Sequence, residues 1–103
     1  MQEFVPVAST SEIAPGDLKQ VFIDTKELAI ANVDGQFFAI DNTCTHEACP
    51  LSEGDLDGFE LTCACHGSQF DVRTGAVMSP PALVPVATYA VRVEGDSILV
   101  AKP

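Results

Sequence analysis

Basic side chains are scarce in this chain, which has 5 Lys and Arg against 15 Asp and Glu among its 103 residues. The formal net charge is -10 at pH 7, and the isoelectric point lies near 4.2. Nucleic acid is a poor partner, because no basic patch exists to neutralise phosphates, and acidic membrane headgroups are disfavoured on the same ground. Two interpretations of the acidity stay open: solubility alone, or steering toward a basic patch on a larger protein, which salt would weaken.

Long apolar runs and an export signal are also missing. No stretch approaches the roughly 18 consecutive apolar residues of a membrane span, and the N-terminus MQEF has neither the basic segment nor the apolar core of a secretory signal. We therefore expect a soluble cytoplasmic protein with no membrane segment. The length suits a single domain, residues 1–103, and no internal repeat, low-complexity tract or linker divides it.

Sequence signals of catalysis are absent as well. The chain has neither a Gly-x-Ser-x-Gly nucleophile elbow nor a glycine-rich phosphate loop. We interpret Glu53, Asp55 and Asp57 as solvated loop residues, or as part of an acidic docking surface, rather than as a general acid and base. The sequence therefore does not predict an enzyme.

Helical periodicity is almost absent, whereas alternating apolar residues and turn dipeptides recur, which predicts an all-β antiparallel framework. Asp34-Gly35 is a strong hairpin signal, because both turn positions tolerate positive φ. Short helices are expected only at residues 9–13 and 51–53. Residues from about 43 to 80 are richer in Gly, Cys, Pro and acidic side chains, so we expect an inserted subdomain that carries a site on loops. The predicted strands are 4–7, 20–23, 27–33, 36–41, 59–62, 70–72, 89–94 and 98–100.

Two short motifs combine cysteine with histidine: CTH at 44–46 and, after a gap of sixteen residues, CACH at 63–66. The chain's only two histidines lie in these motifs, which argues against accidental placement. Each motif would give one sulfur and one nitrogen, as when two histidines replace two cysteines on one iron of a 2Fe-2S centre. The same side chains could also surround a structural zinc ion. The candidate metal ligands are Cys44, His46, Cys63 and His66.

The second motif continues as GSQFD at 67–71 and VRTG at 72–75, with SPP downstream at 79–81. Together with the two Cys/His motifs, these residues resemble the Rieske family, and the resemblance covers nearly the whole chain. It implies a Rieske-like antiparallel β-sandwich or barrel, with a small cluster-binding subdomain on loops and one 2Fe-2S cluster. Zinc modules need neither Ser68 nor a Pro-Pro loop, so a structural zinc-binding module is the weaker alternative.

The resemblance also assigns the ligands. Cys44 and Cys63 would bind one iron as thiolates, while His46 and His66 would bind the other as neutral imidazoles. Two neutral imidazoles in place of two thiolates make the cluster less negative, so it accepts an added electron more readily. The reduction potential is therefore higher than that of plant-type ferredoxins, in a range of about -150 to +300 mV. We expect the second ring nitrogen of each histidine to face solvent and to serve as the electron exit.

Two neighbours of the second motif give opposing indications of the potential. Ser68 lies where high-potential Rieske proteins place a serine that donates a hydrogen bond to a bridging sulfide, although a turn residue is the alternative reading. Phe70 lies where those proteins have a tyrosine, and it has no hydroxyl to donate. We therefore predict an intermediate potential. Pro80 and Pro81 are expected to form a stiff loop that shields the cluster, or else an ordinary turn.

Cys49 and Cys65 remain after the ligands are assigned. If both motifs bind the same cluster, these two thiols come near one another, and a disulfide between them is our hypothesis. Rieske subunits of the cytochrome bc type carry this bridge, whereas many Rieske ferredoxins of ring-hydroxylating oxygenases lack both cysteines. The alternative is two buried free thiols, since disulfides are rare in the cytosol.

The resemblance implies an electron carrier rather than an enzyme. As a Rieske-type ferredoxin, the protein would pass single electrons from a flavin-containing reductase to a terminal aromatic-ring oxygenase, and we expect it to be a monomer. The alternative function is that of a soluble Rieske domain of a cytochrome bc-type complex, or of another high-potential carrier. The bridge and Ser68 favour this alternative, whereas the downstream stretch at 72–81 and the small size favour the ferredoxin.

Overall fold

The computed structural model describes residues 3–44, 49–65, 67–80 and 82–102, so the predicted ligands His46 and His66, and also Pro81, lie outside the described residues. Within these ranges the chain is antiparallel β with two short 3-10 turns, η1 (Thr10–Glu12) and η2 (Leu51–Glu53). No helix in the described part is long and apolar enough to cross a membrane. The strands are β1 (Phe4–Ser9), β2 (Leu18–Ile23), β3 (Lys26–Val33), β4 (Gln36–Asp41), β5 (Asp55–Asp57), β6 (Glu60–Thr62), β7 (Gln69–Asp71), β8 (Val77–Ser79), β9 (Thr88–Tyr89), β10 (Val91–Glu94) and β11 (Ser97–Ala101).

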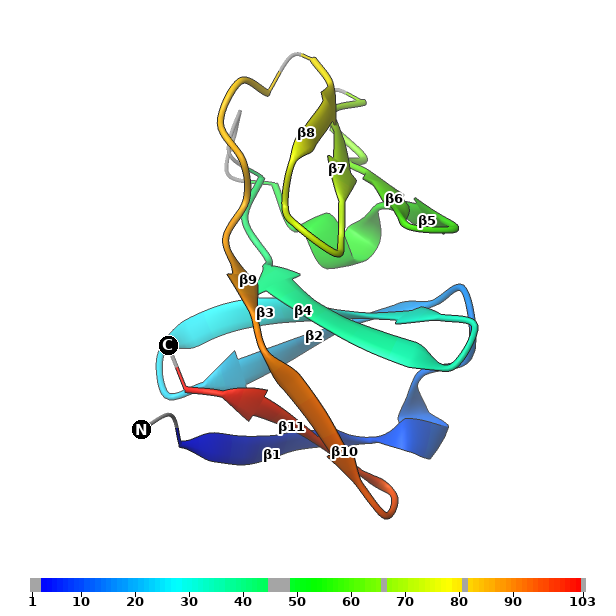
Figure 1. The fold of residues 1–103 in the computed structure, drawn as a ribbon. Helices are drawn as coiled ribbons and strands as arrows, with labels where there is room; N and C mark the ends of the chain where they lie inside the picture. The colour runs from blue at the N-terminus through cyan, green and yellow to red at the C-terminus, as the bar shows by residue number, and fades with distance from the viewer. Residues whose placement is uncertain (1–2, 45–48, 66, 81, 103) are drawn as a thin grey trace.

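The described residues form three sheets, in the strand orders β1-β11-β10, β2-β3-β4-β9 and β5-β6-β7-β8. The first two form the base, and the third, which we call the small sheet, lies above them in Figure 1. Between β4 and β9 the chain leaves the base, forms η2 and the small sheet, and returns. The small sheet is therefore joined to the base by two connections, one that leaves β4 and one that enters β9.

Strand β3 supplies both hydrophobic cores, because residues 28–33 are all buried. Side chains alternate between the faces of a strand. On one face, Leu28 and Ile30 pack in the base core with Ile98 and Val100. On the other face, β3 contributes to the upper core, whose buried members are Ala29, Ala31, Val33, Ile40, Cys44, Leu51, Leu61, Cys63, Phe70, Val72, Ala82 and Val86.

The predicted all-β class is confirmed, as is the hairpin at Asp34-Gly35, where φ is 51° and 90°. The two helix candidates are 3-10 turns, and the strands expected at 59–62 and 70–72 appear as β6 and β7. The strand expected at 89–94 is instead divided at Ala90, because β9 pairs with β4 whereas β10 pairs with β11. The prediction missed β5 and β8. Two of the three residues of β5 are Asp, which is depleted in strands, and β8 is followed directly by two prolines.

A polar contact fixes the junction below the small sheet. The Tyr89 hydroxyl of β9 donates a hydrogen bond of 2.6 Å to the carboxylate of Asp41, the last residue of β4. Lys26 approaches the same carboxylate at 3.2 Å. Burial, followed by the bond to Asp41, raises the pKa of the Tyr89 hydroxyl well above its usual range. The stability from this contact is therefore present below the unfolded pKa of about 10 and is lost as pH rises through the folded value.

Gly75 lies in close contact with the backbone of Val86, and a substitution at Gly75 can test this contact. Its φ is +79°, and a Cβ added there would overlap the carbonyl oxygen of Val86. Gly95 also has a positive φ, of +61°, but open space around it. We predict that Gly95→Ala lowers the free energy of unfolding by about 1 kcal/mol, the cost of the left-handed backbone alone. Gly75→Ala should cost about 2 kcal/mol more, since overpacking is added.

Urea denaturation of both glycine variants beside the parent protein measures the difference. Equal losses for Gly75→Ala and Gly95→Ala would contradict the close approach to Val86.

Candidate metal centre

The first cysteine loop is closed by backbone bonds at its base. Thr43 and Pro50 form an isolated antiparallel bridge, and the Cys44 amide donates to the Cys49 carbonyl at 3.0 Å. Buried Asn42 holds the following turn, because its side-chain oxygen accepts from the Ser52 amide at 2.7 Å. The two ends of the loop are therefore held together by backbone contacts, with Cys44 at its start.

The second cysteine loop is closed in the same way. The Cys63 amide donates to the Ser68 carbonyl at 2.8 Å, again across five positions, and the Gly67 amide donates to the Cys63 carbonyl at 3.1 Å. Gly67 has a φ of +77°, a conformation that glycine adopts without a Cβ penalty. Strands β6 and β7 extend from the loop in register, with Thr62 opposite Gln69. Each motif thus begins with a cysteine at the base of a closed loop.

Cys44 and Cys63 are the described cysteines that lie outside the disulfide. Their exposed fractions are 4% and 2%, and both pack in the upper core. Both are therefore shielded from water, as suits thiolate ligands of an iron centre. The predicted imidazole ligands, His46 and His66, lie outside the described residues, so the geometry of the full ligand set stays a prediction.

Cys49 and Cys65 form a disulfide, with Cα atoms 6.5 Å apart. The bridge joins the end of the first loop to the second, as the disulfide hypothesis expects. The sulfur atoms of Cys49, Cys63 and Cys65 lie within 4.8 Å of one another. Because two of these sulfurs are bonded together, the trio can offer a metal only one thiolate, from Cys63.

Ser68 is fully buried, with an exposed fraction of 0%. Its hydroxyl oxygen accepts a hydrogen bond of 3.0 Å from the Ala82 amide, in the segment that contains the two prolines. A serine hydroxyl that accepts one bond still has its own hydrogen to donate. The predicted donation to a bridging sulfide is therefore compatible with the Ala82 contact, and it stays a prediction. Phe70 is fully buried in the upper core.

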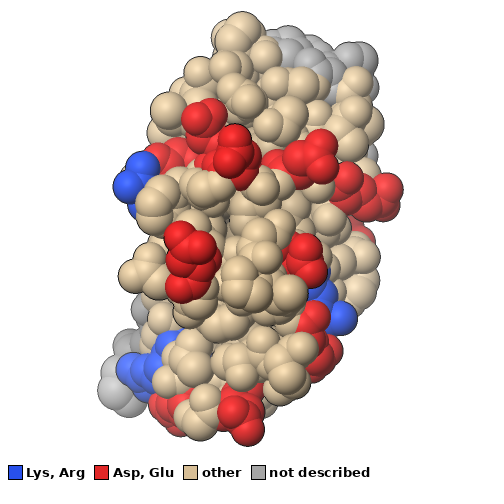
Figure 2. Space-filling model, turned by 90° about the vertical axis from the view of Figure 1, so that its right-hand side faces the viewer, with Lys and Arg blue, Asp and Glu red and all other residues tan. Residues whose placement is uncertain are grey.

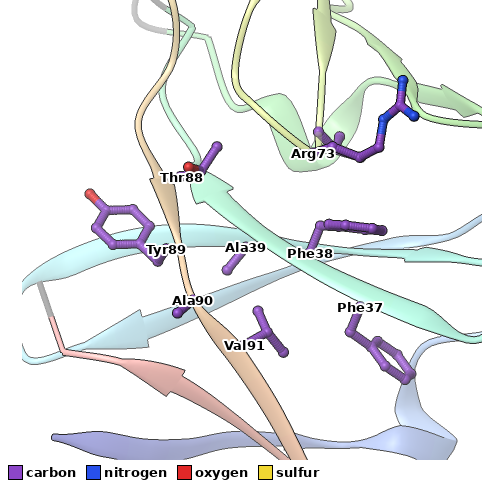
Figure 3. Close-up of a pocket in the computed structure, with 9 residues that line it drawn as sticks. Phe37, Phe38, Ala39, Arg73, Thr88, Tyr89, Ala90 and Val91 are labelled. Carbon is purple, nitrogen blue, oxygen red and sulfur yellow. The ribbon is translucent and has the colours of Figure 1, made fainter. Parts of the chain in front are cut away.

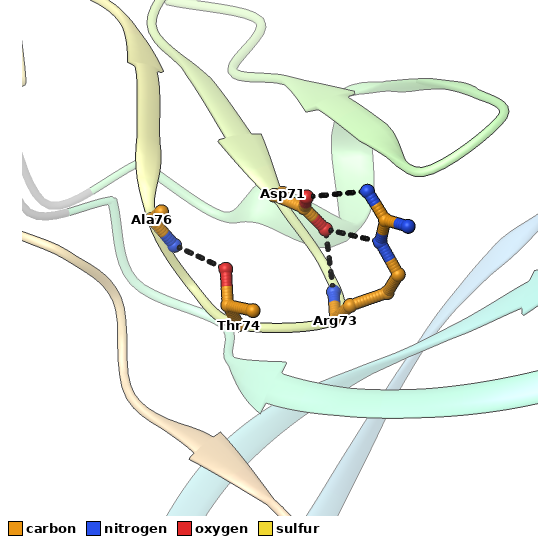
Figure 4. A network of polar contacts seen from close by, with 4 residues as sticks. All are labelled: Asp71, Arg73, Thr74 and Ala76. Carbon is orange, nitrogen blue, oxygen red and sulfur yellow. Dashed lines mark hydrogen bonds and ion pairs between the residues drawn. The ribbon is translucent and has the colours of Figure 1, made fainter.

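Sequence reasoning missed the role of Arg73, which follows β7. Its guanidinium makes two bonds to Asp71, at 2.8 and 3.1 Å, and its amide adds a third at 2.9 Å, as Figure 4 shows. The bond from the Arg73 side chain, ahead of the opposing effect of burial, lowers the pKa of the Asp71 carboxyl. The only sequence signal was an acid and a base two positions apart in a turn before Gly75.

The same guanidinium connects the small sheet to the base. It lies 4.0 Å from the ring centre of Phe59, and that ring meets Phe38 of β4 edge to face at 5.9 Å. Such contacts contribute of the order of 1 kcal/mol each. The pair with Asp71 stabilises the fold above the unfolded carboxyl pKa, and this contribution is lost as pH falls through the lowered folded value.

A shallow groove opens on the base, away from the cysteine loops. Phe37 and Phe38 line it from opposite sides of β4, with Val91 of β10 on the Phe37 side and Arg73 on the Phe38 side (Figure 3). It forms where β4 and β10 diverge into different sheets. None of its lining residues belongs to either cysteine loop, so the groove is separate from the candidate metal centre.

Comparison with known proteins decides the nature of that centre. A family model described as the Rieske [2Fe-2S] domain matches residues 3–90. The chain belongs to the Rieske family. Its cofactor is therefore a Rieske-type [2Fe-2S] cluster, and the buried thiols of Cys44 and Cys63 suit such a group. The resemblance inferred from the two motifs is confirmed.

Several similar proteins are ferredoxin components of dioxygenase systems. The biphenyl dioxygenase ferredoxin subunit of Pseudomonas sp. (strain KKS102) is 46% identical over 98 residues, covering 94% of this chain and 90% of that protein. The naphthalene 1,2-dioxygenase ferredoxin component of Pseudomonas aeruginosa is 36% identical over 99 residues, covering 96% and 95%. The ferredoxin of carbazole 1,9a-dioxygenase from Nocardioides aromaticivorans IC177 superposes with a TM-score of 0.93 at 34% identity, covering 97% and 98%.

The disulfide leads to a prediction about stability. A bridge that closes a loop of this size, with a sequence separation of 16, contributes about 3 kcal/mol by restricting the unfolded chain. We predict that Cys49→Ser/Cys65→Ser lowers the free energy of unfolding by about that amount, as measured by urea denaturation. A thiol reductant, which breaks the bridge, should destabilise the parent protein and leave the stability of the double variant unchanged. Four titratable thiols in the unfolded, unreduced, metal-free parent, in place of two, would refute the bridge.

Proposed function

We propose that this protein carries single electrons through its Rieske cluster, from a flavin-containing reductase to a terminal aromatic-ring oxygenase. Similarity along the whole chain carries the proposal, since the relatives are named as ferredoxin components of biphenyl and naphthalene dioxygenase systems. A chain similar to this one, with a TM-score of 0.90 and 37% identity, occurs in a complex of reduced oxygenase and oxidised ferredoxin of carbazole 1,9a-dioxygenase. An electron carrier makes and breaks no covalent bond, so the protein would be a component of an oxygenase system rather than an enzyme.

The proposed ligands are the thiolates of Cys44 and Cys63 on one iron and the neutral imidazoles of His46 and His66 on the other. The burial of both cysteines and the matching closure of their loops support this set. When bound, the cluster supplies a site that takes up and releases one electron. The two cysteine loops would hold the ligands in place, and the Cys49–Cys65 bridge would keep the loops together.

Further parts of the proposal concern the setting of the protein. We propose that it works as a monomer in the cytoplasm, and that residues 43–80 act as the cluster-binding subdomain. The alternative function is that of a high-potential carrier of the cytochrome bc type. Two observations favour this alternative: the disulfide between the loops and the buried hydroxyl of Ser68.

The direct test of the function is electron transfer followed by stopped-flow absorbance. The cluster-loaded protein, reduced anaerobically, is mixed with the oxygenase of the biphenyl dioxygenase from Pseudomonas sp. (strain KKS102). We expect the protein to be reoxidised with one electron passed per chain. His46→Ala should lose the cluster and its colour, since one iron would lose a ligand. A cluster that cycles normally with small reagents but passes no electron to the oxygenase would contradict the proposed partner.

The acidic surface supports a role in steering toward the partners. Lys and Arg are few on the face drawn in Figure 2, whereas Asp and Glu side chains lie across much of it. In the small sheet, Asp57 and Glu60 are exposed and stand directly opposite one another on β5 and β6. Like charges in such a pair destabilise a sheet. A function in attracting a basic partner would explain why the hairpin carries them.

Charge variants distinguish steering from solubility. We predict that Asp57→Asn/Glu60→Gln slows association with the oxygenase about tenfold at low salt, because long-range attraction raises on-rates by factors of this size. The control, Glu94→Gln/Asp96→Asn, removes the same charge at the β10–β11 turn, at the far end of the base (Figure 1). Stopped-flow rates against ionic strength provide the measurement. Rates that neither pair changes, or that do not depend on salt, would favour solubility alone, whereas equal slowing by both pairs would assign the steering to the net charge rather than to this hairpin.

A further inference from the structure

Ser68 connects two loops that are distant in the sequence. Its carbonyl accepts the Cys63 amide and closes the second cysteine loop, while its hydroxyl oxygen accepts the Ala82 amide at 3.0 Å. The two residues are fourteen positions apart, and the segment between them includes β7 and β8. The environment of the hydroxyl is thus determined by the segment that follows the small sheet, which we call the third loop (residues 80–87).

The Ala82 contact restricts the direction of the hydroxyl hydrogen. A serine oxygen has one hydrogen and two lone pairs, and a free hydroxyl rotates to suit its surroundings. When the Ala82 amide donates to one lone pair, the hydrogen must point away from Ala82. Because Ser68 is fully buried, no bulk water competes for this hydrogen. Of the three staggered positions around the oxygen, the hydrogen is thereby excluded from the one that faces Ala82, which narrows the directions in which the hydroxyl can donate.

The third loop is itself anchored on both sides of its exposed part. Ala82 and Val86 are buried in the upper core with the two ligand cysteines. The Val86 amide donates to the Gly75 carbonyl at 2.9 Å, so the loop is also tied to the turn between β7 and β8. Leu83, between these anchors, is 87% exposed. The Ala82 amide is therefore presented to Ser68 by a segment whose position is fixed at two points.

We propose that Ala82 is a positioning residue for electron transfer: its amide directs the Ser68 hydroxyl so that the hydroxyl donates to the cluster and stabilises the reduced state. A hydrogen bond to a cluster sulfur raises the reduction potential. The Ala82 amide thus acts on the potential through the Ser68 hydroxyl. This inference rests on the proposed placement of the cluster between the two cysteine loops.

The test removes the amide hydrogen of Ala82 without changing the side chain. Replacement of Ala82 by L-lactic acid turns this amide into an ester, which cannot donate. The midpoint potential of the cluster-loaded protein is measured by voltammetry for this variant, for Ser68→Ala and for the two changes combined. We expect both single changes to lower the potential, the ester by at least half of the Ser68→Ala shift, and the combination to equal Ser68→Ala alone.

If the potential of the combined variant equals that of Ser68→Ala, the Ala82 amide acts through Ser68; a further variant tests whether Ala82 has only a structural role. Ala82→Gly keeps the amide and removes the buried methyl, so it should lower the thermal midpoint of unfolding while the potential stays at the parent value. An ester variant with the parent potential, beside a shifted Ser68→Ala, would overturn the proposal. Additive shifts, or a Ser68→Ala potential equal to that of the parent, would overturn it equally. A different result would contradict the proposed function: a protein with an intact cluster and the parent potential that passes no electron to the oxygenase.

Discussion

The structure depends on a strand that is buried on both faces. Residues 28–33 of β3 lie between β2 and β4 and supply side chains to two cores at once, large ones downward at Leu28 and Ile30 and small ones upward at Ala29 and Ala31. Because side chains alternate along a strand, a shift of one residue in register would exchange the two sets. The base core would then lose Leu28 and Ile30, and the upper core would lose the small side chains that β3 contributes to it.

Above β3, the proposed cluster site consists of loops rather than of long strands. Both cysteine loops begin with a buried cysteine and are closed by a backbone bond five positions later. The disulfide joins them, and the Asp71–Arg73 pair with Phe59 connects the small sheet to Phe38 of the base. Loops held at several points suit an electron carrier, since ligands that move little between the two redox states keep the cost of electron transfer low.

The sequence was informative where the signal is local. The hairpin at Asp34-Gly35 and the two Cys/His motifs can be identified from neighbouring residues alone, and the motifs led to the family. Contacts between distant segments left no such trace, as with Ala82 and Ser68 or Arg73 and Phe59. Strands β5 and β8 escaped prediction because Asp makes up most of β5 and two prolines directly follow β8, and both residue types argue against a strand. The imidazole ligands lie outside the described residues, so their assignment rests on the sequence and the family.

The central claim is that a Rieske cluster in this protein serves an oxygenase system rather than a high-potential chain. The most direct measurement is the midpoint potential of the purified protein against pH, by voltammetry. The account predicts an intermediate value, below about +100 mV within the range of about -150 to +300 mV known for these centres, and no change through neutral pH. A potential well above about +100 mV that falls with pH from near neutrality would contradict it and favour the bc-type carrier.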